Sequence, residues 1–285
     1  MFAGKKSAQI REILISESAW EEMTCLFAPS LASLANMIQP FDESKFIERL
    51  YNDIDFIITD LERASNKYYC DDEDKITNVI ALALRMKGYD ATEQTNSNGT
   101  VDLTIRDNTK KFTWLAEAKR GYSLNSVFEG LLQLVTRYLR RETHAGLLIY
   151  HQKKGAMAFL RDWHTYLSSG SYRKYSKIQE RIDECDKCFR LSPVAYSMIP
   201  SNNSHYFDFT AVKPNDGQVK VRCFIADLNF DPIDKSARTN ASLAKGQCKI
   251  SLTDICTHWE CEGEIPGDVN TVFQMLKNLH PEYFV

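Results

Sequence analysis

The stretch 101-VDLTIRDNTKKFTWLAEAK-119 contains two runs of β-favouring residues separated by the turn dipeptide Asp107-Asn108. A third run, Tyr89 to Thr95, precedes it across a second turn dipeptide, Asn98-Gly99. Short β-favouring runs joined by such turns are typical of antiparallel hairpins. The sequence therefore predicts a three-stranded meander over residues 89–119.

Helices are predicted on both sides of this meander. The acidic cluster 71–74 suits a helix N-terminus, and the helix that follows carries Ile76, Ile80 and Leu84 at helical spacing before Gly88 ends it. A second helix is expected over 125–141, followed by a strand over 145–150. The predicted order is α-β-β-β-α-β.

The region before this core has a helical pattern. Residues 12–64 are predicted to be helical, with breaks at Pro29 and Pro40. The apolar stripe of the later part is Ile47, Leu50, Ile54, Ile57 and Leu61. It either covers the core as part of a helical hairpin or forms a dimer or partner interface.

The C-terminal third is expected to extend the sheet rather than to form an independent domain. Helices are predicted over 159–167, 174–183 and 269–279, the last capped by Asp268, and strands over 218–230 and 247–252. We thus predict an α/β (α+β) fold with a helical N-terminal region, residues 1–66, and a domain covering 67–285.

Composition excludes several classes of protein. The chain has 285 residues of ordinary globular composition, with no signal-peptide pattern and no apolar run long enough to span a membrane. We therefore expect a cytoplasmic protein whose eight cysteines are reduced thiols. A net charge of −3 argues against indiscriminate coating of nucleic acid.

A basic strip over 137–177 is nevertheless able to bind phosphates. The nucleic-acid-binding candidates in it are Arg137, Arg140, Lys153, Lys154, Arg173 and Lys174. Helical spacing predicts that Gln133, Arg137 and Arg140 share a polar face, which is either solvated or in contact with phosphates.

Three charged residues of the meander suggest phosphodiester chemistry. Glu117 and Lys119 are two apart and project from the same face of one strand, and Asp102 lies on the preceding strand. Two or three carboxylates hold a magnesium ion in many hydrolytic sites. A fourth charged residue, Glu73, is in phase with the buried stripe of its helix, where a purely solvating carboxylate is not needed.

In this ordered set the sequence resembles the PD-(D/E)xK, or restriction-endonuclease-like, nuclease superfamily. The resemblance covers about residues 70–152, and it rests on Glu73, Asp102, Glu117-Ala118-Lys119 and Gln133. It implies an αβββαβ core with a central mixed sheet. Gln133 resembles the glutamine found in branches related to the RecB nuclease, but Tyr138 follows five residues later rather than four, so that branch is not assigned.

The resemblance also implies roles for these residues. Asp102 and Glu117, with the main-chain carbonyl of Ala118, would ligate Mg²⁺ or Mn²⁺, and Lys119 would position the attacking water. Glu73 would support a second metal, with Asp74 as its substitute if the helix is shifted by one residue, and Gln133 would support the site.

The function expected from this resemblance is metal-dependent hydrolysis of nucleic acid, with DNA preferred and endonuclease action favoured. The superfamily suggests a role in bacterial antiviral defence, restriction or repair, as a homodimer or with an ATPase or helicase partner. Two alternatives stay open: a non-catalytic nucleic-acid-binding or assembly subunit that keeps the fold, and an interaction protein with a regulated nuclease site.

One further motif invites a metal. Cys185-x-x-Cys188 is a zinc-like pair, with Cys256, His258 and Cys261 as completing ligands if the segments meet. Reduced thiols without metal are the alternative that we favour.

Overall fold

The computed structural model describes residues 42–96, 99–107, 109–189, 205–263 and 268–284. The helices expected within 12–41 lie outside these ranges. Residues 46–285 form one compact unit. The first part of the described chain contains α4 (Glu43–Arg63), α5 (Ser65–Tyr68), α6 (Glu73–Met86), β1 (Asp90–Asn96), β2 (Thr100–Arg106), β3 (Thr113–Arg120), α7 (Leu124–Gln133), a π-helix (Leu134–Tyr138) and β4 (His144–His151).

The second part begins with α8 (Ala156–Ser168), which is followed by 3₁₀ segments at Ser171–Lys174 and Ser176–Arg181. After these come α9 (Ile182–Phe189), β5 (Tyr206–Val212), β6 (Gln218–Asp227), α10 (Lys235–Arg238), α11 (Ala241–Glu262), α12 (Val269–Leu279) and a 3₁₀ turn at Pro281–Tyr283.

A six-stranded mixed sheet organises the fold, with the strand order β1-β2-β3-β4-β6-β5. The β1–β2, β2–β3 and β5–β6 pairs are antiparallel, whereas β3–β4 and β4–β6 are parallel. The predicted meander, the mixed sheet and its extension by the C-terminal third are therefore confirmed. The chain is an α/β protein.

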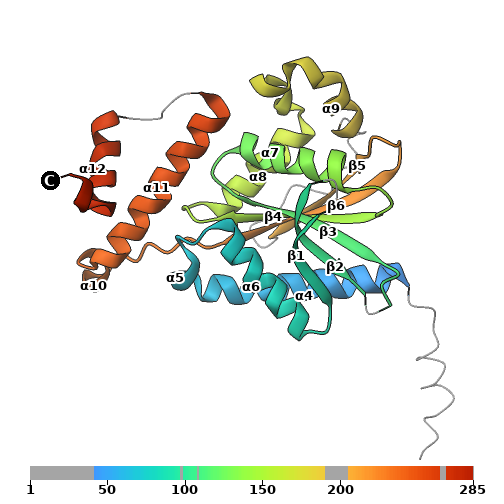
Figure 1. Ribbon diagram of the computed structural model, residues 1–285, viewed down its shortest axis with the longest axis horizontal. Helices are drawn as coiled ribbons and strands as arrows, with labels where there is room; N and C mark the ends of the chain where they lie inside the picture. Colours follow the sequence, from blue (N-terminus) through green and yellow to red (C-terminus); the bar gives the residue numbers. More distant parts are fainter. Residues whose placement is uncertain (1–41, 97–98, 108, 190–204, 264–267, 285) are drawn as a thin grey trace, which may run out of the picture. The chain divides into compact units, whose positions relative to one another are not determined.

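Helices cover both faces of this sheet (Figure 1). On one face α4 and α6 pack against strand residues such as Trp114 and Phe224, and on the other α7 and α8 pack against residues such as Leu147 and Val221. The apolar stripe of α4 is buried in the first of these layers. Its covering role is thus confirmed, and its use as a dimer interface is wrong because the sheet already occupies it.

The start of α6 is set by its N-cap. The Asp72 carboxylate accepts a hydrogen bond of 2.9 Å from the backbone N–H of Lys75, which satisfies a donor that has no partner inside the helix. Ile76, Ile80 and Leu84 are buried as predicted. The helix ends before Gly88, whose φ of +90° suits glycine.

The helix expected over 125–141 is interrupted. The α-helical part ends at Gln133 and continues as one π-helical segment, in which the Leu139 N–H donates to the Leu134 carbonyl five residues earlier at 3.1 Å. Leu139 is extended, so Arg140 lies beyond the helix and the predicted polar face of Gln133, Arg137 and Arg140 is wrong. The Glu142 carboxylate accepts from the Arg140 N–H, which gives this group a partner outside the helix.

Two C-terminal expectations are also corrected. Residues 247–252 form part of α11 rather than a strand, because Asn240 caps this helix and Gly246 and Ile250, four apart, share a buried helix face. The predicted helix over 174–183 is instead 3₁₀ up to Arg181 and α-helical only from Ile182. In contrast, α12 matches its prediction, with Asp268 accepting from the Asn270 N–H.

No helix among the described residues combines the length and the apolar character needed to cross a membrane.

Candidate active site

Asp102 lies where β2 and β3 separate. The pairing of the two strands begins at Leu103↔Ala116, one residue after Asp102 on β2. In place of a ladder bond, the Asp102 carboxylate accepts a hydrogen bond of 2.8 Å from the Ala118 N–H. The local divergence of the strands thus brings the Asp102 carboxylate beside the part of β3 that carries Glu117 and Lys119.

Glu117 and Lys119 project from β3 toward α7, which comes unusually close at Gly130. A Cβ atom at Gly130 would lie 2.7 Å from Cγ of Lys119 and 3.2 Å from Cγ of Glu117. These distances leave no room for a larger residue. Glycine at this position lets the α7 backbone pack directly on the two charged side chains.

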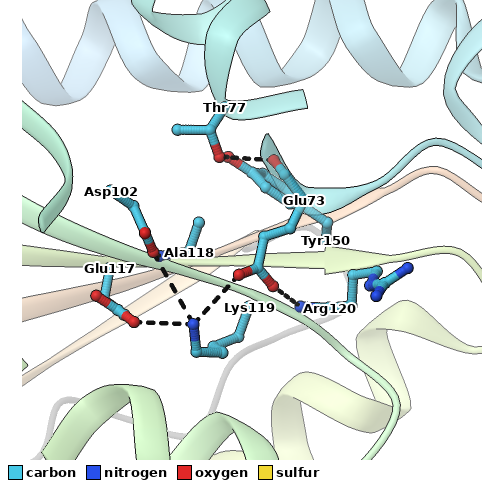
Figure 2. Close-up of polar contacts among 8 residues, drawn as sticks. All are labelled: Glu73, Thr77, Asp102, Glu117, Ala118, Lys119, Arg120 and Tyr150. Carbon is cyan, nitrogen blue, oxygen red and sulfur yellow. Dashed lines mark hydrogen bonds and ion pairs between the residues drawn. The ribbon is translucent and has the colours of Figure 1, made fainter. Parts of the chain in front are cut away.

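The Lys119 ammonium lies at the centre of three carboxylates (Figure 2). Its Nζ is 2.8 Å from Oε1 of Glu117, 3.2 Å from Oε1 of Glu73 and 3.9 Å from Oδ2 of Asp102. The four charged residues that the sequence singled out therefore meet. We call them the carboxylate cluster.

The first turn of α6 is held so that Glu73 reaches this cluster. The second carboxylate oxygen of Glu73 accepts from the Arg120 N–H at 2.8 Å. The Thr77 hydroxyl donates to the Glu73 carbonyl at 2.8 Å and lies 3.0 Å from the buried hydroxyl of Tyr150 on β4 (Figure 2). Contacts to α6 and β3 thus fix Glu73 from both its backbone and its side chain.

Burial dominates the electrostatics of the cluster. Glu117 is only 2% exposed, and burial raises its pKa to about 7 despite the opposing charge of Lys119. Burial also raises the pKa of Glu73, again against the effect of Lys119. Burial would lower the pKa of Lys119, but the charges of Glu73 and Glu117 outweigh it and raise that pKa. The site therefore favours a cation strongly.

The donor groups fit a hard divalent cation. Oε2 of Glu117 is buried and has no hydrogen-bond partner within the described residues, which leaves a carboxylate oxygen with unused acceptor capacity. Asp102 and Glu73 supply further carboxylate oxygens. Within those same ranges, however, no group of three or more acidic, His or Cys side chains is arranged as a metal site. The Lys119 ammonium lies among the carboxylates instead. Ala118 contacts the cluster through its N–H, which donates to Asp102, rather than through the carbonyl that was expected to bind the metal.

No hydrogen bond or ion pair joins Gln133 to the cluster within the described residues. Gln133 is half-buried at the end of α7 and lines a cavity that none of the four clustered residues lines. No contact within the described residues therefore supports the role predicted for Gln133 in the site.

Tyr138 follows Gln133 by five residues, rather than the four found in the RecB-related branches. The π-helical segment inserts one residue after Gln133, so Tyr138 takes the orientation that a residue four positions after Gln133 would have in an uninterrupted α-helix. The Tyr138 ring is buried, and burial together with the charges of Glu117 and Asp102 raises its pKa. Its Cε1 atom would be 3.0 Å from a Cβ at Gly99. Tyr138 therefore forms a wall of the site. In the sequence, only its spacing of five residues from Gln133 pointed to it.

Several residues of the predicted basic strip are engaged within the chain. Lys153 pairs with Asp254 at 2.8 Å, Lys154 with Asp231 at 2.5 Å, and Arg173 with Asp186 at 2.9 Å. Lys154 is nevertheless exposed, as are Arg137, Arg140 and Lys174. A phosphate that contacted any of the first three cations would have to compete with a carboxylate.

The cysteine pair does not form a metal centre with the other described ligands. Cys185 and Cys188 are free and buried on α9, and Cys261 and Cys256 are free thiols on α11. Burial raises the pKa of Cys185 to about 11, which disfavours the thiolate that zinc requires. His258 contacts Asp254 through Nδ1. Reduced thiols without metal therefore stay the alternative that we favour.

In the comparisons with known proteins, no protein-family model, curated protein or solved structure matched this chain.

Proposed function

We propose that this chain is a Mg²⁺-dependent nuclease that hydrolyses phosphodiester bonds, with DNA as its preferred substrate. The observation that carries the proposal is the carboxylate cluster, in which Glu117 is 2% exposed and keeps an unpartnered oxygen beside Asp102, Glu73 and Lys119. Buried charges of this kind are costly, and an ordinary surface ion pair does not require them. The element order α6-β1-β2-β3-α7-β4 supports the same restriction-endonuclease-like core.

In this proposal Asp102 and Glu117 hold the metal ion and Glu73 supports it. When bound, Mg²⁺ supplies charge neutralisation at the phosphate and lowers the pKa of a water molecule. Lys119 stays near the reacting groups, where its N–H donors orient a water or a phosphate oxygen. Glu73 and Glu117 fix the ammonium by ion pairs of 3.2 and 2.8 Å.

Water exclusion is the contribution of α7. The helix packs on the cluster at Gly130, and Tyr138 adds an aromatic wall. Both features keep the local dielectric low, which strengthens the interactions of every charge in the site.

The test is cleavage of circular plasmid, linear duplex, single-stranded DNA and RNA with Mg²⁺ or Mn²⁺. Wild type would be compared with Glu117→Ala and Lys119→Ala, and Glu180→Ala, an exposed carboxylate outside the cluster, would be the matched control. We expect metal-dependent cleavage that both cluster variants lose and the control keeps. Equal cleavage by wild type and Glu117→Ala would refute the assignment.

A non-catalytic role is the second candidate, and one observation favours it. Lys119 already neutralises part of the negative charge, as it would in a purely structural cluster. Such a subunit would bind nucleic acid or assemble with an ATPase-type partner without hydrolysing anything. Calorimetry separates the two candidates, because Mg²⁺ binding that disappears in Asp102→Ala is expected only for the nuclease.

A further inference from the structure

A second cavity lies beside α7, away from the carboxylate cluster. Its volume is about 570 Å³, and residues of α7, the π-helix, the 3₁₀–α9 segment and the β5–β6 turn line it. None of Glu73, Asp102, Glu117 and Lys119 lines this cavity. Five cations do: Arg137, Lys177, Arg181, Lys187 and Lys213.

The lining carries more positive than negative charge. Glu129, Glu184 and Asp216 are its three acidic residues, against the five cations. One cation and one acid neutralise each other, since Arg181 pairs with Glu184 at 2.8 Å. The remainder leaves an excess of positive charge around a concave surface, which attracts anions.

Lys213 gives this excess a specific location. It is only 5% exposed, and its Nζ donates to the carbonyls of Arg140 at 3.0 Å and Glu142 at 2.8 Å. The structure gives Lys213 no ion pair with a carboxylate among the residues it describes, although Asp216 lines the same cavity. Carbonyls satisfy its hydrogen bonds but do not neutralise its charge, so a buried ammonium here favours an anionic ligand.

The same cavity has an apolar part. Leu132, Ile178, Val212 and Pro214 line it together with the cations. Pockets of 300–1,000 Å³ with apolar walls and a few charged groups are typical small-molecule sites. A phosphate alone would leave these apolar walls unused, whereas a nucleotide offers both an anion and a flat apolar base.

We propose that this cavity binds a nucleotide unit, with its phosphate drawn to the cations and its base packed on the apolar residues. The unit is either part of a nucleic-acid strand or a free nucleotide. This inference goes beyond the proposed nuclease function, because binding here needs neither the carboxylate cluster nor hydrolysis.

The experiment measures binding without cleavage, in EDTA and in a Glu117→Ala background. Fluorescence anisotropy would use labelled single-stranded and duplex DNA, and calorimetry would use AMP, ATP and inorganic phosphate. The test variant combines Arg137→Glu with Lys187→Glu, two exposed residues of the lining. Lys249→Glu, an exposed lysine of α11 outside the cavity, is the control.

We expect the double variant to weaken binding by about tenfold or more, as loss of phosphate-contacting cations does, and the control to match its parent. Lys213→Met should weaken binding as well. Because Lys213 also holds the 140–142 backbone, its variant is interpreted only if its urea midpoint stays near that of the parent.

The two sources of the nucleotide give different results. If the double variant loses DNA binding and the parent binds neither AMP nor ATP, the ligand is part of a nucleic-acid strand. If the double variant loses binding of AMP or ATP, the ligand is a free nucleotide. Equal affinities in parent, double variant and control, or no binding of any probe, would overturn the inference. If the wild-type protein cleaves DNA but the cavity variants bind as the parent does, the nuclease proposal stands and only the nucleotide-binding inference fails. If the cavity binds nucleotides but the wild-type protein never cleaves, only the nuclease proposal fails.

Discussion

Substitution of Glu117 by Gln tests the electrostatics of the carboxylate cluster through stability. Burial raises the pKa of Glu117 from its ordinary value of 4.5 to about 7. The folded state therefore binds the proton more tightly than the unfolded chain does, so the free energy of unfolding falls as the pH rises from about 4.5 to about 7. At about 1.4 kcal/mol per pH unit, the full loss is about 3 kcal/mol.

The assay is urea unfolding of wild type and Glu117→Gln from pH 4.5 to 8.5 in EDTA. Groups outside the cluster contribute equally to both proteins, so the difference between the two curves reports on Glu117 together with its coupling to Lys119 and Glu73. We expect the variant to gain stability relative to wild type by about 3 kcal/mol between the ends of this range, with most of the gain between pH 5 and 7. A difference that stays constant with pH, or that changes in the opposite direction, would refute the reasoning.

Three further predictions follow from the site. Mg²⁺ binding at pH 6 should release close to one proton, because the metal needs Glu117 ionised, and calorimetry in buffers of different ionisation enthalpy measures this; a buffer-independent heat would contradict it. Gly130→Ala should destabilise the fold by about 1–3 kcal/mol through overpacking on Lys119 and reduce cleavage, and unchanged thermal unfolding would show that α7 can move away. Asp72→Ala should cost about 1 kcal/mol in urea unfolding through loss of the α6 cap, whereas Asp74→Ala, which caps nothing, should cost less.

The parts of the fold that sequence predicted correctly depend on local patterns. Turn dipeptides marked the meander, and the acidic cluster marked the start of α6, because both signals come from residues next to each other in the chain. The meeting of Asp102 with Glu117 was also predictable, since a hairpin brings strand neighbours opposite each other.

The wrong or missing predictions depend on contacts between distant segments. Residues 247–252 alternate like a strand, but Gly246 and Ile250 form a helix face against Tyr69, which no local pattern reveals. Just beyond the π-helical segment, Lys213 donates to the carbonyls of Arg140 and Glu142, which is another contact between distant segments that no local pattern reveals. The ion pairs of Lys153 and Lys154 with Asp254 and Asp231 join segments about eighty to a hundred residues apart, so composition alone overstated the free basic strip.

Formal charge explains why this cluster should bind a divalent rather than a monovalent cation. Three carboxylates and one ammonium give a net charge of −2 when every group is ionised. With the pKa of Glu117 near 7, the proton on that carboxyl reduces the charge to −1 at lower pH. A divalent ion can neutralise the full −2, whereas a proton or a sodium ion leaves negative charge in a buried site, where it is costly. The proton of Glu117 and the metal ion are therefore expected to compete for the same oxygens, and the ammonium of Lys119 sets how strongly either one binds.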